Sequence, residues 1–209
     1  MLAIARREKE LQELKSNVPG NIFISALDVC DEMLLEDSIA KFAEEHGGID
    51  GSVHSAGVSM FTPLRAFNNE AARKMMDVCF WAGVSLLQIA TKKKYSNPHA
   101  SHVQIGSVRA HKGEKGMGIY SAAKAAVNAG VKIFAKELAT KGIRVNSISP
   151  GLIETNLSKD LIADTDVENL PPLGKGTTTN VADLTLFLLS EQSKWITGTD
   201  IIIDGGYLA

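Results

Sequence analysis

The sequence has few cysteines, little net charge and no long apolar run, and each of these scarcities excludes a class of protein. Its two cysteines, Cys30 and Cys79, have no metal-ligand spacing and make no disulfide framework, so a reducing compartment, the cytoplasm, is expected. The net charge of -2 gives no general attraction for nucleic acid or an anionic membrane. No apolar run reaches the roughly 20 residues of a membrane-spanning helix. We therefore expect a soluble protein that has neither nucleic acid nor a membrane as a partner.

The chain of 209 residues suits one domain, 1–209, in which strand-like and helix-like segments alternate. Apolar runs predict strands at 2–5, 21–27, 49–53, 101–105, 143–148 and 199–203. Apolar residues at helical spacing predict helices at 7–15, 31–46, 70–93, 119–140 and 180–190. Strands joined by helical crossovers form a parallel sheet that is covered on both faces. The pattern predicts an α/β protein with a doubly wound, Rossmann-like parallel sheet.

Short polar or glycine-containing motifs follow three of the predicted strands, at 54–57, 106–107 and 149–151. Open parallel sheets bind ligands at the carboxyl ends of their strands, so we expect these motifs to form one site. The least regular segment, 156–179, contains Pro171-Pro172 and is expected to cover the substrate.

The clearest chemistry belongs to Tyr120 and Lys124, which lie one turn apart on one face of a predicted helix. A neighbouring ammonium favours the phenolate, so Lys124 is expected to lower the pKa of Tyr120 from its ordinary value of ~10. Such a tyrosine exchanges a proton with a carbonyl or alcohol oxygen. Ser107, at a strand end, either holds the same oxygen by a hydrogen bond or simply caps a turn. The hydride for this interconversion must come from a cofactor, because no side chain supplies one.

These motifs resemble, in the same order along the chain, those of the short-chain dehydrogenase/reductase family of classical type, and in particular its 3-oxoacyl-acyl-carrier-protein reductase-like members. Asp28-Val29 resembles the turn that contacts adenine, and 54–57 resembles the Asn-Asn-Ala-Gly turn beside the cofactor ribose. Ser107, Tyr120 and Lys124 match the catalytic positions. The segments 143–155 and 196–206 match the nicotinamide-contacting segment and the closing strand.

The resemblance implies a role for each matched residue. Tyr120 would be the general acid and base, Lys124 would lower its pKa and bind the nicotinamide ribose, and Ser107 would orient the substrate carbonyl. Ile153 and Thr155 would contact the nicotinamide carboxamide. The other cofactor-binding residues that it implies are Asp28, Val29, Ser55, Ala56, Gly57, Pro150 and Gly151.

The sequence departs from the family pattern in two places. Cys79 stands where the family has an asparagine that bends a helix and holds a water of the proton relay. A thiol is a weak hydrogen-bond partner in comparison with an amide. The opening strand and its Thr-Gly-x-x-x-Gly-x-Gly phosphate loop have no match, so the chain is expected to lack them. In the family order 3-2-1-4-5-6-7, that strand lies between strands 2 and 4, and its absence would leave both without ladder partners. Either Met1 is an internal methionine of a longer protein, or the gene is truncated and its product impaired.

The end of the first predicted strand indicates which cofactor is preferred. An acidic residue there binds the ribose 2′-hydroxyl of NAD, whereas Arg6 and Arg7 suit the 2′-phosphate of NADP through charge-assisted bonds. NADP is therefore the predicted cofactor, with NAD as the alternative. The alternative interpretation of Arg6 and Arg7 is that they only begin a charged helix and have no role in cofactor choice.

The sequence thus predicts an NADP(H)-dependent oxidoreductase that interconverts a small-molecule carbonyl and a secondary alcohol. One alternative is a remnant or scaffold that keeps the fold without binding cofactor, and a sugar-nucleotide epimerase is disfavoured by the lack of a substrate domain. No metal site is expected, because His54, His102 and His111 have no metal-like spacing and are interpreted as non-catalytic. The resemblance implies a homodimer or homotetramer formed through the two long helices, and the substrate itself is not identified.

Overall fold

The strands form two separate parallel sheets. The computed structural model describes residues 1–18, 20–155 and 170–209. One sheet pairs β1 (Leu2–Ala5) with β2 (Phe23–Ala26). The other has the order β3 (Ile49–His54), β4 (Ser96–Ile105), β5 (Arg144–Pro150) and β6 (Asp200–Ile203). The parallel pairing with helical crossovers confirms the predicted α/β, Rossmann-like class.

Helices connect these strands. The longer ones are α1 (Glu8–Asn17), α2 (Glu32–His46), α3 (Asn69–Met76), α4 (Ala82–Ala90), α5 (Gly118–Ala139) and α7 (Thr178–Leu189). Single 3₁₀ turns are η1 (Leu64–Ala66), η3 (Val108–Ala110) and η5 (Glu191–Ser193). Within the described residues, no helix combines the length and the apolar character that crossing a bilayer requires.

The predicted helix at 70–93 is wrong in two respects. A π-helical turn, η2 (Asp77–Trp81), separates α3 from α4, and α4 ends at Ala90. β4 therefore begins at Ser96 rather than at residue 101. A π turn inserts one residue without changing the apolar character of the segment, so the periodicity of the sequence does not reveal it.

The ends of α2 follow from its sequence. The backbone N–H of Leu34 donates to Asp31 Oδ1 at 3.1 Å, which caps the first turn. Gly47 ends the helix with a φ of +83°, a left-handed conformation that glycine adopts without a steric penalty. This helix leads directly into β3, whose carboxyl end contributes to the candidate site.

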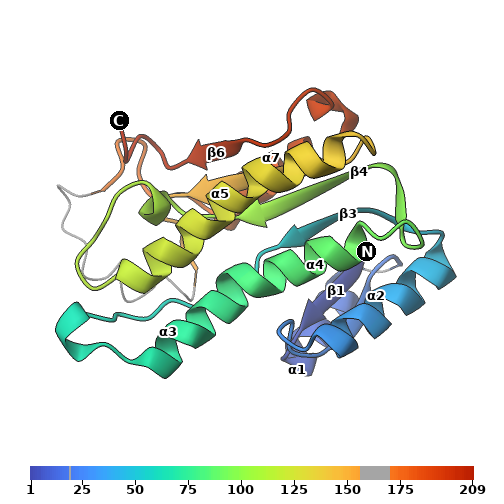
Figure 1. Cartoon of the computed structure of the whole chain (residues 1–209), viewed down its shortest axis with the longest axis horizontal. Coiled ribbons are helices and arrows are strands. Elements are labelled where there is room, and N and C mark those ends of the chain that lie inside the picture. The colour runs from blue at the N-terminus through green and yellow to red at the C-terminus, as the bar shows by residue number, and fades with distance from the viewer. Residues whose placement is uncertain (19, 156–169) are drawn as a thin grey trace.

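Helices cover both faces of the four-stranded sheet. Val145 and Ile148 lie three residues apart on β5, so their side chains point to opposite faces. Val145 packs with Leu87 of α4 and Val127 of α5, whereas Ile148 packs with Leu188 of α7. α4 and α5 therefore cover the face that is turned towards the viewer in Figure 1, and α7 covers the other.

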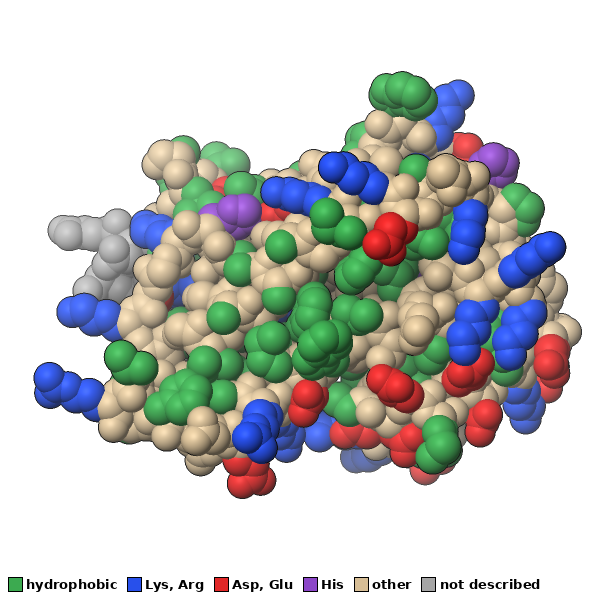
Figure 2. All heavy atoms as spheres, in the orientation of Figure 1, with side chains coloured by type: hydrophobic (Ala, Val, Ile, Leu, Met, Phe, Trp, Pro, Cys, Tyr) green, Lys and Arg blue, Asp and Glu red, His purple; other side chains and the backbone are tan. Residues whose placement is uncertain are grey.

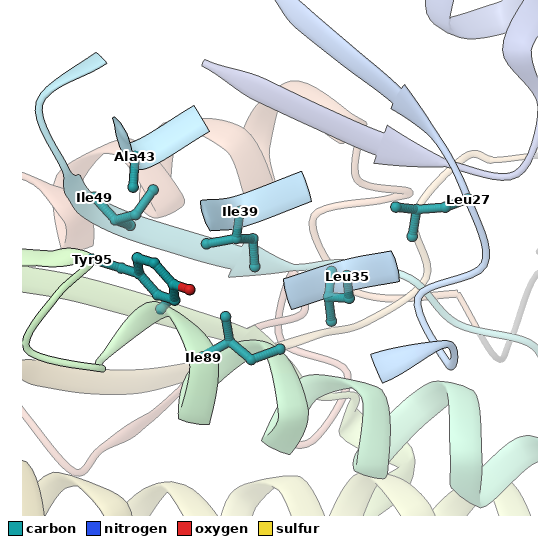
Figure 3. Close-up of a cluster of buried hydrophobic side chains, with 8 residues drawn as sticks. Leu27, Leu35, Ile39, Ala43, Ile49, Ile89 and Tyr95 are labelled. Carbon is teal, nitrogen blue, oxygen red and sulfur yellow. The ribbon is translucent and has the colours of Figure 1, made fainter. Parts of the chain in front are cut away.

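A buried apolar cluster links the two sheets. Figure 3 shows Leu35 and Ile39 of α2 among Leu27, which follows β2, Ile49 of β3 and Ile89 of α4. Ile4 of β1 packs against the same cluster. Burying each of these side chains stabilises the fold by about 1.5–3 kcal/mol. Contacts through α2, rather than a shared hydrogen-bond ladder, therefore hold the two sheets together.

Among the described residues, no strand pairs with both sheets. β1 and β2 pair with each other, and β3 is an edge strand of the four-stranded sheet. That the chain lacks an opening strand stays a prediction.

Candidate active site

The carboxyl ends of β3, β4 and β5 lie side by side. The parallel register pairs His54 with Gln104 and Ile105 with Ile148. The chain therefore leaves the sheet at the same edge after each strand, and the N–H of Gly106 still donates to Ile148 O at 2.7 Å. The three motifs that follow these strands in the sequence are thus brought to one edge, as predicted.

Tyr120 and Lys124 lie on the first turns of α5, directly above this edge. The Lys124 side chain is buried, with 4% exposure, and its Nζ donates to Ile105 O at 2.7 Å. The same nitrogen lies 5.8 Å from the centre of the Tyr120 ring. A Cβ placed on Gly57 would lie 3.8 Å from Lys124 Nζ, so the 55–57 turn borders the same corner. The structure therefore brings together the turn after β3, the end of β4 and the tyrosine–lysine pair.

The electrostatics of this pair differ from the prediction. Burial raises the pKa of Tyr120 above its ordinary value, because a phenolate in a poorly hydrated place is unfavourable. A hydrogen bond with Ser107 and the charge of Arg109 act in the opposite direction but do not outweigh burial. Burial also lowers the pKa of Lys124. The expectation that Lys124 holds the pKa of Tyr120 below its ordinary value is thus wrong for this arrangement.

Ser107 follows β4 and is nearly buried. Its Oγ accepts a hydrogen bond from the N–H of Arg109 at 3.2 Å, and this bond caps the 3₁₀ turn η3. The capping interpretation of Ser107 is therefore confirmed, but capping uses only an acceptor position of the hydroxyl. Its proton is left for the hydrogen bond with Tyr120, which acts to lower the pKa of that phenol, and a substrate oxygen beside Tyr120 would accept the same proton.

Cys79 replaces the expected asparagine and ties the π turn to the loop after β3. Its Sγ donates to Val58 O at 3.4 Å and accepts from Val58 N at 3.5 Å. The side chain is fully buried. The thiol therefore holds both backbone groups of one residue, although each sulfur hydrogen bond is weak.

Replacing Cys79 with alanine is expected to lower the free energy of unfolding by about 1–3 kcal/mol, because two partly buried backbone groups of Val58 lose their partner and a small cavity forms. Urea denaturation measures this change. Cys30→Ala, which removes the exposed thiol, is the matched control and is expected to stay within about 0.5 kcal/mol of wild type. Equal midpoints for Cys79→Ala and wild type would contradict the structural role of the thiol.

At the other sheet, the carboxyl ends of β1 and β2 bring Arg6 and Asp28 together. Arg6 Nη1 lies 3.9 Å from Asp28 Oδ2, and both side chains are largely exposed. Arg7 instead pairs with Glu10 of α1 at 2.9 Å. A cavity of about 500 Å³ opens beside Asp28 and is bordered by Cys30, Asp77 and Val78. Val29, partly buried, follows Asp28 at the same edge.

The segment after β5 runs beside the carboxyl end of β6. Gly151 N donates to Ile203 O at 2.9 Å, and a Cβ on Gly151 would lie 2.7 Å from Asp204 Cα, so only glycine fits this approach. Pro150 pairs with Ile203 in the sheet, and Ile153 forms a parallel bridge with Gly176. Thr155 ends this described stretch, and most of the predicted substrate-covering segment, 156–169, lies outside the described residues.

The residues present fit a dinucleotide cofactor. The cavity beside Asp28 is large enough for a purine ring, and Arg6 lies next to Asp28. The buried amine of Lys124 and the turn at 55–57 lie further along the strand ends, beside the segment after β5. The arrangement can therefore hold an elongated ligand along the strand ends, with one end in this cavity and the other near Tyr120.

A buried polar cluster next to this site was not predicted. Asp200 of β6 accepts hydrogen bonds from Asn128 of α5, at 2.9 Å, and from His111, at 2.7 Å. One signal was available: Asn128 follows Lys124 by one helical turn and shares its face of α5. The partners from β6 are distant in the sequence, so no local pattern indicated them.

Comparison with known proteins agrees with this fold. A family model described as enoyl-(acyl carrier protein) reductase matches residues 2–208. Carbonyl reductase family member 4 of Xenopus tropicalis is 31% identical over 206 residues, which cover 98% of this chain and 86% of that protein. The 3-oxoacyl-acyl-carrier-protein reductase of Chlamydia muridarum is 31% identical over 198 residues, or 93% of this chain and 80% of that protein.

Solved structures give the same result. A short-chain dehydrogenase/reductase of the glucose/ribitol dehydrogenase type from Brucella melitensis superposes with a TM-score of 0.93 at 25% identity, covering 99% of this chain and 85% of that one. A gluconate 5-dehydrogenase from Burkholderia cenocepacia, in complex with NADP and tartrate, has a TM-score of 0.89 at 24% identity, with 99% and 84% covered. By family model, by identity to relatives and by fold, the chain belongs to the short-chain dehydrogenase/reductase family of oxidoreductases.

Proposed function

We propose that this enzyme is an NADP(H)-dependent reductase or dehydrogenase that interconverts a carbonyl and a secondary alcohol at Ser107, Tyr120 and Lys124. The observation that carries the proposal is the buried Lys124 amine one turn from Tyr120, with Ser107 at the adjacent strand end. The relatives named carbonyl reductase and 3-oxoacyl-acyl-carrier-protein reductase support a carbonyl substrate. When bound, the nicotinamide cofactor supplies or accepts the hydride.

The chain's own residues account for the proton and for orientation. In the reductive direction, the Ser107 hydroxyl donates a hydrogen bond to the substrate oxygen and fixes the carbonyl in place. The Tyr120 phenol donates its proton to that oxygen as negative charge develops there. Its raised pKa keeps the phenol protonated at neutral pH, which suits the role of acid. The Lys124 ammonium beside the resulting phenolate stabilises the charge until a proton returns from solvent.

The cofactor-binding residues follow the strand ends. Arg6 and Asp28 are proposed for the adenosine end, with Val29 beside the adenine and Arg7 assisting from the start of α1. Lys124 and Tyr120 are proposed for the nicotinamide ribose. The turn Ser55, Ala56 and Gly57 and the segment with Pro150, Gly151, Ile153 and Thr155 are proposed to border the rest of the cofactor.

Replacing Arg6 with alanine is expected to raise the KM for NADPH about tenfold, because one charge-assisted bond to the 2′-phosphate is worth about 1.5–3 kcal/mol. The KM for NADH, which has no 2′-phosphate, is expected to change little. Steady-state kinetics with both cofactors measures the difference. Lys9→Ala, which removes another exposed cation of α1, is the matched control. Equal effects on NADPH and NADH would contradict the proposed role of Arg6, and better use of NADH by wild type would overturn the NADP preference.

The proposed substrate is a small-molecule carbonyl compound or secondary alcohol, and the proposed place of action is the cytoplasm.

We also propose a homodimer or homotetramer. Figure 2 shows apolar side chains gathered on the face that carries α4 and α5, and Trp81 and Ile133 are each more than half exposed. An apolar surface of this kind is typical of protein interfaces. Sedimentation analysis that finds only monomers would overturn this assignment.

The activity is tested by following NADPH absorbance with a panel of a 3-oxoacyl thioester, a 2-oxo ester and an aromatic ketone. Consumption that depends on both enzyme and carbonyl is expected. Failure to oxidise NADPH or NADH with any of them, by a folded protein, would favour the alternative of a scaffold that keeps the fold without catalysis.

A further inference from the structure

One nearly buried carboxylate lies beneath the candidate site. The Asp200 side chain is only 8% exposed. Ser147 Oγ donates to it at 2.7 Å, and Ser149 Oγ donates at 2.8 Å. Asn128 Nδ2 donates at 2.9 Å, and His111 Nε2 lies 2.7 Å from Asp200 Oδ2. Because a carboxylate only accepts, the His111 proton sits on Nε2 in this contact.

These donors explain how the charge is tolerated. A buried carboxylate is unfavourable unless hydrogen bonds replace the water that it has lost. The two serine hydroxyls come from β5, which pairs with β6, and the Asn128 amide comes from α5, which packs against β5. His111 is different, because it belongs to the segment that leaves the sheet after Ser107. A second contact joins this segment to the end of the chain, since Lys112 Nζ lies 4.4 Å from the centre of the Tyr207 ring.

The donors to Asp200 come from three of the segments on which the proposed chemistry depends. His111 follows Ser107 by four residues, and Asn128 follows Lys124 by one helical turn. Ser149 directly precedes the Pro150-Gly151 turn. One carboxylate therefore fixes the serine segment, the tyrosine–lysine helix and the segment after β5 relative to one another.

The backbone of η3 connects His111 to Ser107. Ala110 N donates to Ser107 O at 2.9 Å, and His111 N donates to Val108 O at 2.9 Å. Ser107 is the N-cap and His111 the C-cap of this single turn, so the two residues stand at its opposite ends.

We propose that Asp200 and His111 are positioning residues that hold Ser107 at the distance from Tyr120 that the reaction requires. Neither touches the reacting atoms. The expected effect on turnover rests on the proposed function. The expected effect on the 107–112 segment, which the contact holds in place, does not. Small misplacements of a catalytic group lower turnover strongly, so loss of this contact acts mainly on kcat.

The test compares three variants. His111→Leu removes the donor to Asp200, His111→Gln keeps an amide donor, and His46→Leu removes another partly exposed histidine that faces a carboxylate, at the other sheet. His111→Leu is expected to lower kcat about tenfold or more, with the KM for NADPH changed less than about twofold. His111→Gln is expected to recover most of the lost turnover, and His46→Leu to keep wild-type kcat. A kcat per folded enzyme in His111→Leu equal to that of His46→Leu would overturn the proposal.

Hydrogen exchange of the 107–112 amides gives a readout that needs no activity. Faster exchange is expected in His111→Leu than in His46→Leu, with protection restored in His111→Gln. Unchanged exchange in all three would overturn the proposal even if the enzyme is active. If wild type reduces no carbonyl while exchange changes as expected, the proposed function fails and the positioning contact stands.

Discussion

Tyr120→Phe is expected to lower kcat by about 10²- to 10⁴-fold, because the substitution removes the one group proposed to exchange a proton with the substrate oxygen. The phenyl ring keeps the packing of the first turn of α5, so the KM for NADPH and the unfolding midpoint are expected to change little. Because burial raises the pKa of Tyr120, carbonyl reduction by wild type is expected to persist through neutral pH and to fall only as the pH passes this pKa. Alcohol oxidation, which needs the phenolate, is expected to rise with pH over the same range.

Tyr95→Phe is the matched control for this prediction. Tyr95 is buried directly before β4, and its hydroxyl lies 3.4 Å from Glu36 Oε1, away from the site. The control is expected to keep wild-type kcat. Turnover of Tyr120→Phe within about threefold of wild type would contradict the assignment of Tyr120 as the proton donor.

The second large effect concerns stability in acid. Burial lowers the pKa of His54 to about 4, with the charge of Lys124 acting in the same direction, and burial alone lowers the pKa of His102 to about 4. His54 Nε2 lies 3.0 Å from Val78 O, and His102 Nδ1 lies 2.8 Å from Ser52 Oγ. Both imidazoles are therefore neutral in the folded protein at neutral pH.

The sign of the pH effect follows from these pKa values. Between the ordinary histidine pKa of about 6.5 and the folded value of about 4, the unfolded chain binds protons that the folded protein does not. The free energy of unfolding therefore falls as the pH drops from about 6.5 towards 4, by at most roughly 3 kcal/mol for each histidine. Above about 6.5, neither group contributes to the pH dependence.

Urea denaturation between pH 8 and 4.5 measures this loss, and His102→Gln removes one of the two titrating groups. The variant is expected to lose less stability than wild type below pH about 6.5, and to run parallel to wild type between pH 7 and 8. Equal slopes for both proteins in the acid range would show that His102 is not the source of the effect.

The sequence was sufficient for most of the elements and for the family, because both depend on local patterns. Alternation of strands and helices predicted the parallel α/β arrangement, and the order of the motifs predicted the family. The π turn at 77–81 was missed because it leaves the apolar spacing almost unchanged. The hydrogen bonds that tie this turn to the loop after β3 are also hidden in the sequence, since they join Cys79 to the backbone of Val58, twenty-one residues away.

The site was predicted in its chemistry but not in its electrostatics. The spacing of Tyr120 and Lys124 indicates a neighbouring charge, which lowers the pKa of a phenol, but it says nothing of burial, which raises that pKa more strongly. The Asp200 cluster joins residues from β5, β6 and α5 with the segment after β4, so only the tertiary structure reveals it. Local spacing finds the reacting groups, whereas their surroundings depend on distant segments.

Transfer of deuterium from the reduced cofactor tests the central claim most directly. NADPH deuterated at the reactive C4 position, on each face in turn, is incubated with the enzyme and a carbonyl compound that it reduces. The account predicts an alcohol carrying deuterium on the former carbonyl carbon, from one face of the nicotinamide only, at a rate that Tyr120→Phe lowers sharply. Deuterium released to water, or an alcohol without label from both of the labelled cofactors, would contradict hydride transfer at this site.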